Sequence, residues 1–230
     1  MVARIKGYRA SDDIETSLRY AEGHRKVLEA YGIKQVTSTV HNWLEDPNTY
    51  VLIVESEDGS KIYGGTRVQV RSPNLKMPME DAIAKIDKRI YGYMDAIGDY
   101  NVAEFCGLFN SREVAGYGIG SLYLCRIAMA VSGLVGIKNL LALCSPITLL
   151  MSERIGFEIL KELGNNGTFY YPKEGLIATS LIARDLVNLP GATDEERAKI
   201  FSLRENPKQT VTEDGRRGEL TIIYDIARWL

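Results

Sequence analysis

Three glycines alternate with other residues in the stretch 115–121, AGYGIGS. A β-rich run precedes them and a long apolar segment follows, which predicts a strand, a turn and a helix. This arrangement can bind phosphate, because amides at a helix N-terminus are unpaired and carry positive partial charge. Glycine also lets the backbone approach an anion closely. The alternative is a tight connection before a buried helix, and the glycines alone do not decide between the two.

One acid, Glu104, lies within the apolar run VAEFCGLF, residues 102–109. Burial would raise the pKa of its carboxyl toward neutral pH, so that it could act as a general base. The alternatives are a structural carboxylate paired with an arginine or a backbone donor, or a carboxylate at a solvated strand end. Cys106 shares the face of Glu104 by strand alternation. Because no histidine is placed beside Cys106 or Cys144, we expect both cysteines to be small core residues lining a cleft.

Two common nucleotide-binding patterns do not fit the glycines. A P-loop needs a lysine and then Ser or Thr after its last glycine, whereas Gly120 is followed by Ser121 and Leu122. A dinucleotide fingerprint has the spacing GxGxxG, which these three glycines do not match.

Hydrophobic periodicity and turn residues predict an alternation of strands and helices. The expected strands are 2–8, 49–56, 61–70, 102–109, 139–146, 157–163, 176–183 and 219–226. The expected helices are 12–31, 39–44, 79–97, 118–136, 147–156 and 194–204. We expect Ser11 to cap the first helix, and the polar stretch 205–218 to be exposed.

The run 102–124, VAEFCGLFNSREVAGYGIGSLYL, resembles the central motif of the GNAT superfamily of N-acyltransferases. In that motif a strand with an acidic residue leads into a loop of the form R/Q-G-x-G-x-G/A, which opens a helix. The glycines align without a gap, and the interval from Glu104 to Ala115 matches the usual distance. Downstream, SERIGFE at 152–158 resembles the family's Y-x-x-x-G-F-E segment. The order of elements in 1–183 also agrees with the family fold.

The resemblance implies a donor site along the fourth strand. The loop would hold the pyrophosphate of coenzyme A, or the phosphopantetheine of an acyl carrier protein, and its residues are Gly116, Tyr117, Gly118, Ile119, Gly120 and Ser121. The backbone of Leu108, Phe109 and Asn110 would pair with the pantetheine arm. The thioester carbonyl would lie where strands 102–109 and 139–146 splay apart, with a backbone N–H stabilising the oxyanion. Glu104 would take the proton of the attacking amine.

Two positions depart from the family pattern. Ala115 stands where Arg or Gln is usual, so one side chain near the phosphates is lost. Ser152 stands where the family often has a tyrosine that reprotonates the leaving thiolate, and serine is a poor acid for that step. Ser145, another candidate catalytic residue, either faces the acceptor or is a turn residue. Arg112 either contacts a phosphate or pairs with Glu113.

The inserted helix at 79–97 is similar in placement to one in acyl-homoserine-lactone synthases and related N-acyl amino acid synthases, whose fourth strand also has an early acidic residue. The similarity is one of layout, without that group's set of N-terminal Arg, Phe and Trp positions. Tyr170, Tyr171 and strand 176–183 would form acceptor-side walls or ordinary sheet packing.

Composition and sequence patterns argue against several other classes of protein, namely those that bind nucleic acid, span a membrane, are secreted or hold a metal. The chain has 230 residues, a net charge of −2 and a pI near 5.8, which argues against a chain-wide nucleic-acid footprint. The apolar region 127–137 is too short for a membrane span, and the N-terminus lacks the apolar segment of a signal peptide. With two histidines and no CxxC or HExxH pattern, no metal site is expected. These features favour a cytoplasmic protein.

We therefore expect an α/β fold of GNAT type, with a mixed, bent sheet and helices on both faces. Residues 1–183 form the acyltransferase core, and 184–230 form a helical and strand extension that covers the acceptor side or makes a homodimer contact. The expected function is N-acyl transfer from acetyl-CoA, a longer acyl-CoA or an acyl carrier protein to a small-molecule amine. The alternative is a catalytically silent GNAT-fold module that binds acyl-CoA as a sensor or scaffold.

Overall fold

A computed structural model describes residues 1–33, 36–215 and 217–229, and in these ranges ten strands form one mixed sheet. Its order is β6-β8-β5-β4-β3-β2-β1-β10-β9, with β7 paired to β8 outside this path. The strands are β1 (Val2–Arg9), β2 (Thr49–Ser56), β3 (Ile62–Val70), β4 (Val102–Asn110), β5 (Asn139–Cys144), β6 (Glu158–Ile159), β7 (Thr168–Tyr170), β8 (Ile177–Ala183), β9 (Lys208–Gly215) and β10 (Gly218–Asp225).

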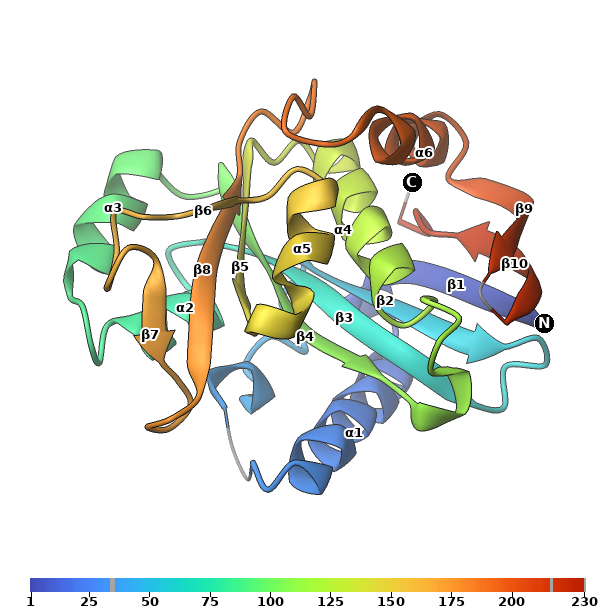
Figure 1. Cartoon of the computed structure of the whole chain (residues 1–230), viewed down its shortest axis with the longest axis horizontal. Coiled ribbons are helices and arrows are strands. Elements are labelled where there is room, and N and C mark those ends of the chain that lie inside the picture. Colours follow the sequence, from blue (N-terminus) through green and yellow to red (C-terminus); the bar gives the residue numbers. More distant parts are fainter. Residues whose placement is uncertain (34–35, 216, 230) are drawn as a thin grey trace.

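Helices cover both faces of the sheet (Figure 1). The α-helices are α1 (Ile14–Ala30), α2 (Pro78–Ile83), α3 (Arg89–Ile97), α4 (Leu122–Leu134), α5 (Pro146–Arg154) and α6 (Asp194–Glu205). Short 3-10 helices are η1 (Ala10–Asp12), η2 (Thr37–Thr39) and η3 (Arg112–Val114). The mixed sheet and its two helical layers confirm the predicted fold class.

The central strand β2 shows how both faces are buried, because all eight of its residues are buried. Leu52 and Val54 point into the core that contains α4, whereas Val51 and Ile53 point into the core that contains α1. This division follows from the two-residue period of a strand. The continuous apolar run YVLIV at 50–54 is therefore typical of a strand that is covered on both faces.

Helix α4 is buried from Tyr123 to Ser132, and this stretch includes the charged residue Arg126. The Arg126 guanidinium donates two hydrogen bonds to the Glu196 carboxylate on α6, with Nε–Oε2 at 2.8 Å and Nη2–Oε1 at 3.2 Å. A buried guanidinium needs such a partner, because removing an unpaired charge from water costs several kcal/mol. The pair thus fixes α6 across the outer side of α4.

Strand β4 changes direction at Gly107, where φ is +65°. The pairing of β3 with β4 shifts register here, between Gly65 and Arg67. The Tyr20 hydroxyl of α1 donates a 3.0 Å hydrogen bond to the Gly107 carbonyl, and a Cβ on residue 107 would lie only 2.2 Å from that hydroxyl oxygen. Such a bulge bends a strand. Parallel pairing of β4 with β5 covers only Val102–Phe105, so the two strands part beyond it.

Several expected element boundaries are wrong. The helix at 79–97 is two helices, α2 and α3, and the exposed Ile86 lies between them. The stretch 205–218 contains strand β9, and a strand within 157–163 is limited to β6. The expected helix at 39–44 is absent from these described residues, which hold turns after η2. Helix α4 begins at Leu122 and α1 is capped by Asp13, whose carboxylate accepts from the Thr16 amide at 2.9 Å.

None of the helices in the described ranges combines the length and the apolar character that a bilayer-spanning segment requires.

Replacing Glu196 with Gln should destabilise the fold by about 3 kcal/mol, because it removes the carboxylate that lies 2.8 Å from the buried Arg126 guanidinium and leaves only the longer, 3.4 Å contact with Glu213. Urea unfolding at pH 7 measures the change. Glu195→Gln is the matched control on the same helix, where the carboxylate is 63% exposed and its loss should change the free energy of unfolding by less than about 0.5 kcal/mol. Equal effects of the two variants would show that the buried pair does not anchor α6.

Candidate active site

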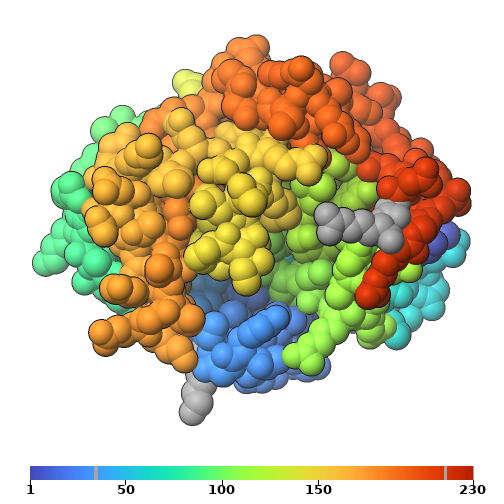
Figure 2. All heavy atoms as spheres, viewed as in Figure 1, coloured from blue at the N-terminus to red at the C-terminus, as the bar shows by residue number. Residues whose placement is uncertain are grey.

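A cavity of about 370 Å³ opens where β4 and β5 separate. Its walls come from α1, η2, β4, β5, α5 and β8, which are distant in sequence. Figure 2 shows the hollow below the yellow atoms of α5 and above the blue atoms of the N-terminal part of the chain. The strand separation that the resemblance implied is therefore present, and it contains a space large enough for part of a small ligand.

Glu104 lines this cavity and is only 3% exposed. Its Oε2 accepts a 2.7 Å hydrogen bond from the Met79 amide at the start of α2. Burial raises the pKa of the Glu104 carboxyl to about 8, although the Met79 amide and the Arg67 guanidinium act in the opposite direction. This carboxyl therefore changes its protonation state near neutral pH, whereas an ordinary glutamate with a pKa near 4.5 stays ionised there.

Arg67 of β3 is a buried cation close to the cavity that sequence reasoning missed. Its Nη1 donates to the Ser38 carbonyl at 2.9 Å and its Nε to the Gln69 side chain at 3.2 Å. Its guanidinium also lies over the Trp43 ring, 4.6 Å from the centroid. Nη2 is buried and has no hydrogen-bond acceptor in the described part of the chain. The only sequence signal was a charge within the β-rich run GGTRVQV.

The cavity also contains the two cysteines expected there. Cys106 and Cys144 line it, and burial raises the pKa of both thiols above the ordinary range. His24 of α1 lies in the same wall, which the sequence did not indicate. Burial and the Arg67 charge lower the pKa of His24 to about 4, so its imidazole is neutral at physiological pH. A thiol with a raised pKa is a poor nucleophile, which favours a lining role for both cysteines.

The glycine loop leads into α4 at Leu122, in the strand–loop–helix arrangement expected from the sequence. Gly116 and Gly118 have φ of +88° and +78°, values that favour glycine. A Cβ on Gly120 would lie 2.0 Å from the Asn110 side-chain oxygen, so this position also requires glycine. Within the described residues, the amides of Gly118, Ile119 and Gly120 have no hydrogen-bond acceptor. These free donors could hold an anion.

The other predicted donor residues lie on the part of β4 that has left β5. Leu108, Phe109 and Asn110 follow the last β4–β5 pair, which is Phe105 with Ala142. Leu108 lines the cavity, whereas the ring of Phe109 is buried beside Tyr20 on the α1 face. Within the described residues, the edge of this segment that continues past β5 has no strand partner, and it borders the cavity at Leu108.

Ser145 and Ser152 both line the cavity, at the two ends of the α5 region. Ser145 is exposed and is the residue before Pro146 at the start of α5. Ser152 is buried, and its hydroxyl donates a 3.0 Å hydrogen bond to the Thr148 carbonyl one turn earlier. That hydrogen bond holds the hydroxyl proton of Ser152 within the helix.

A second cavity, of about 620 Å³, lies beside the first and shares with it Val36, Thr37, Tyr171 and Pro172. The Tyr171 hydroxyl oxygen accepts a 2.8 Å hydrogen bond from the Thr37 amide, which joins the two sides of this shared wall. Its further walls carry Asp81, Lys85 and Tyr91. Tyr171 thus lines both cavities, whereas Tyr170 is exposed on β7 and lines neither of them.

No protein-family model matches the chain, and no curated protein matches it significantly in sequence. Solved structures do match. FeeM, an N-acyl amino acid synthase from uncultured soil microbes, aligns with a TM-score of 0.56 and 15% identity over 79% of this chain and 91% of its own. BjaI, a CoA-dependent acyl-homoserine lactone synthase solved with SAM and isopentyl-CoA, aligns with a TM-score of 0.53 and 12% identity over 88% and 90%.

A putative N-acetyltransferase from Lactobacillus plantarum also matches, with a TM-score of 0.51 and 12% identity over 80% of this chain and 99% of its own. At such identities the similarity concerns the path of the chain. The sheet order, the parting of β4 from β5 and the glycine loop before α4 are features of this chain itself. Together with these three solved structures, they show that the chain has a GNAT-type fold.

Proposed function

We propose that the protein is an N-acyltransferase that moves an acyl group from a pantetheine thioester to a small-molecule amine. The observation that carries the proposal is Glu104, a buried carboxyl with a pKa raised to about 8 in the cavity between β4 and β5. A group of that pKa in a cavity is a candidate for proton transfer. The acyl transfer performed by proteins of similar fold supports the same reaction class.

In this proposal the donor lies along the open part of β4. The amides of Gly118, Ile119 and Gly120 bind its phosphate groups, and the backbone of 108–110 pairs with its amide-containing arm. The donor supplies an acyl carbonyl and a thiolate leaving group. Coenzyme A is the donor we favour, because the loop offers donors for phosphate and a CoA-dependent synthase has a similar fold.

The acceptor amine enters through the 620 Å³ cavity and reaches the shared wall at Tyr171. There Asp81 and Lys85 provide one negative and one positive side chain, which suits an acceptor that carries both an amine and a carboxylate. The similarity in fold to an N-acyl amino acid synthase supports an acceptor of this class. Glu104 then takes a proton from the amine as the amine nitrogen bonds to the acyl carbon and the carbon–sulfur bond breaks.

Reprotonation of the thiolate is assigned to water. Ser152 is in the position expected for the acid, but its proton is held in the hydrogen bond to the Thr148 carbonyl. A direct role for Ser152 would require that bond to break. We therefore do not keep Ser152 as a catalytic residue in the proposed mechanism.

Glu104→Gln should lower kcat by about 100-fold or more, because general-base catalysis contributes at least that much to such reactions. The Kd of the donor should change little, since Glu104 binds neither its phosphates nor its arm in this mechanism. Below pH 8 the kcat/KM of the native protein should rise with pH, because only the ionised carboxylate accepts a proton and its pKa is about 8. The variant should lose this rise. Thiol release measured from pH 6 to 9 tests both points, and unchanged turnover would remove Glu104 from the mechanism.

Cys106→Ala should retain at least about a third of the native kcat, because the raised pKa of this buried thiol makes it a poor nucleophile. Cys106 lies in the same cavity wall as Glu104, so this variant also controls for changes in packing. Complete loss of activity in a folded Cys106→Ala protein would instead indicate a covalent acyl-cysteine.

The proposed function itself is tested with acyl-CoA thioesters of increasing chain length and a pool of amines that includes amino acids. Amine-dependent release of free thiol is expected. Thermal stabilisation by the donor without thiol release would show a binding module in place of an enzyme. Neither stabilisation nor thiol release with any thioester would refute the proposal.

A further inference from the structure

Arg217 lies against the start of the glycine loop, although the two are far apart in sequence. It occupies the turn between β9 and β10. A Cβ placed on Gly116 would lie 2.9 Å from the Arg217 Nε, and the Arg217 guanidinium lies over the Tyr117 ring, 6.0 Å from the centroid. In Figure 2 the red atoms of the C-terminal hairpin adjoin the green surface near the loop.

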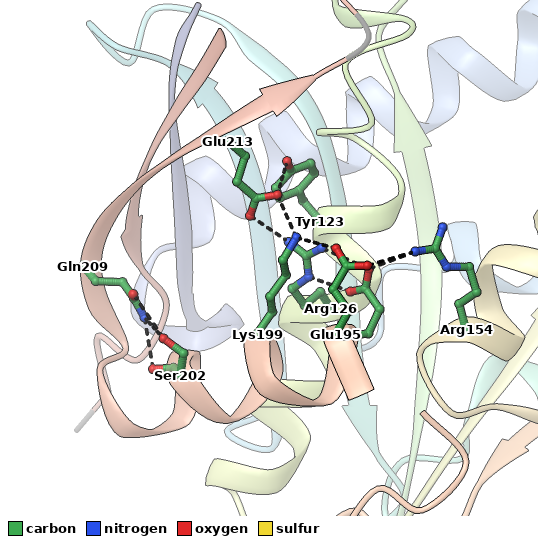
Figure 3. A network of polar contacts seen from close by, with 9 residues as sticks. Tyr123, Arg126, Arg154, Glu195, Lys199, Ser202, Gln209 and Glu213 are labelled. Carbon is green, nitrogen blue, oxygen red and sulfur yellow. Dashed lines mark hydrogen bonds and ion pairs between the residues drawn. The ribbon is translucent and has the colours of Figure 1, made fainter. Parts of the chain in front are cut away.

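The hairpin is held in this position by a polar network that joins β9 to α4 and α6 (Figure 3). The Glu213 carboxylate of β9 accepts from the Tyr123 hydroxyl at 2.9 Å, from the Lys199 ammonium at 3.0 Å and from the Arg126 guanidinium at 3.4 Å. Tyr123 is in the first turn of α4, directly after the glycine loop. The network therefore connects the hairpin to α4, the helix that directly follows the glycine loop.

Positive charge gathers at the glycine loop and the start of α4. The start of α4 carries positive partial charge, and the loop amides of Gly118, Ile119 and Gly120 have no acceptor within the described residues. Arg217 is exposed and adds a full positive charge, and no carboxylate in the described part of the chain pairs with it. A hairpin that brings a cation to the loop before a helix N-terminus provides a place where an anion can bind.

We propose that Arg217 is a phosphate-binding residue of the donor site. The C-terminal hairpin would then supply the cationic side chain that Ala115 cannot provide. The ligand is the phosphate attached to a pantetheine arm, and its oxygens would accept from the Arg217 guanidinium and the loop amides. This inference rests on the proposed donor site and extends it to a segment outside the strand–loop–helix motif.

Binding is measured by calorimetry on the full chain with three probes, coenzyme A, 4′-phosphopantetheine and pantetheine. Arg217→Ala should raise the Kd of the two phosphorylated probes by about tenfold, the scale of one charge-assisted hydrogen bond at an exposed site. The Kd of pantetheine should not change. Arg217→Lys should give an intermediate value, because lysine keeps the charge but loses the planar fork.

Arg4→Ala is the matched control, because Arg4 is an exposed arginine on β1 and its loss makes the same change in net charge. It should leave all three Kd values unchanged. If the native protein binds coenzyme A and Arg217→Ala binds it equally well, the assignment of Arg217 is wrong while the donor site stands. Equal weakening of pantetheine and coenzyme A would also overturn it, by showing that the hairpin only shapes the cleft. If the native protein binds none of the probes, the proposed function fails and the inference fails with it.

Discussion

The contact between Tyr20 and Gly107 is the constraint on which the site depends. One hydrogen bond and one positive φ value force β4 to bulge at the point where its pairing with β5 ends. A side chain at residue 107 would collide with the tyrosine hydroxyl, so the bulge, α1 and the parting of the strands form one unit. The cavity that Glu104 lines opens where this separation begins.

Low solvent exposure gives the site its chemistry. The same burial that raises the pKa of Glu104 to about 8 lowers that of His24 to about 4, so in each case the neutral form is favoured. The charged guanidinium of Arg67 lies nearby, where it is stabilised by the face of the Trp43 ring and by its hydrogen bond to the Ser38 carbonyl. A permanent cation, Arg67, therefore lies close to the cavity, while the neutral forms of Glu104 and His24 are favoured near pH 7.

Sequence patterns predicted the central sheet well because its strands are buried on both faces and read as apolar runs. They failed where local pattern and burial disagree. Ile86 fitted a helical period but is 54% exposed between α2 and α3, and β9 has too few apolar residues to resemble a strand. The glycine loop and Glu104 were found because they are contiguous with a motif. Arg67 and Arg217 were missed because their roles arise from contacts between distant segments.

The parallel pairing of β1 with β10 has a consequence for how the chain is made. Registered pairs run from Val2–Thr221 to Lys6–Asp225, so β1 pairs with a strand that is synthesised more than 200 residues after it. Until then β1 presents an unpaired edge whose Ala3 and Ile5 side chains belong to the core. An open apolar edge of this kind is a template for intermolecular pairing. The topology therefore requires that β1 be protected during synthesis. Once the β9–β10 hairpin has formed, β10 covers this edge and prevents such pairing.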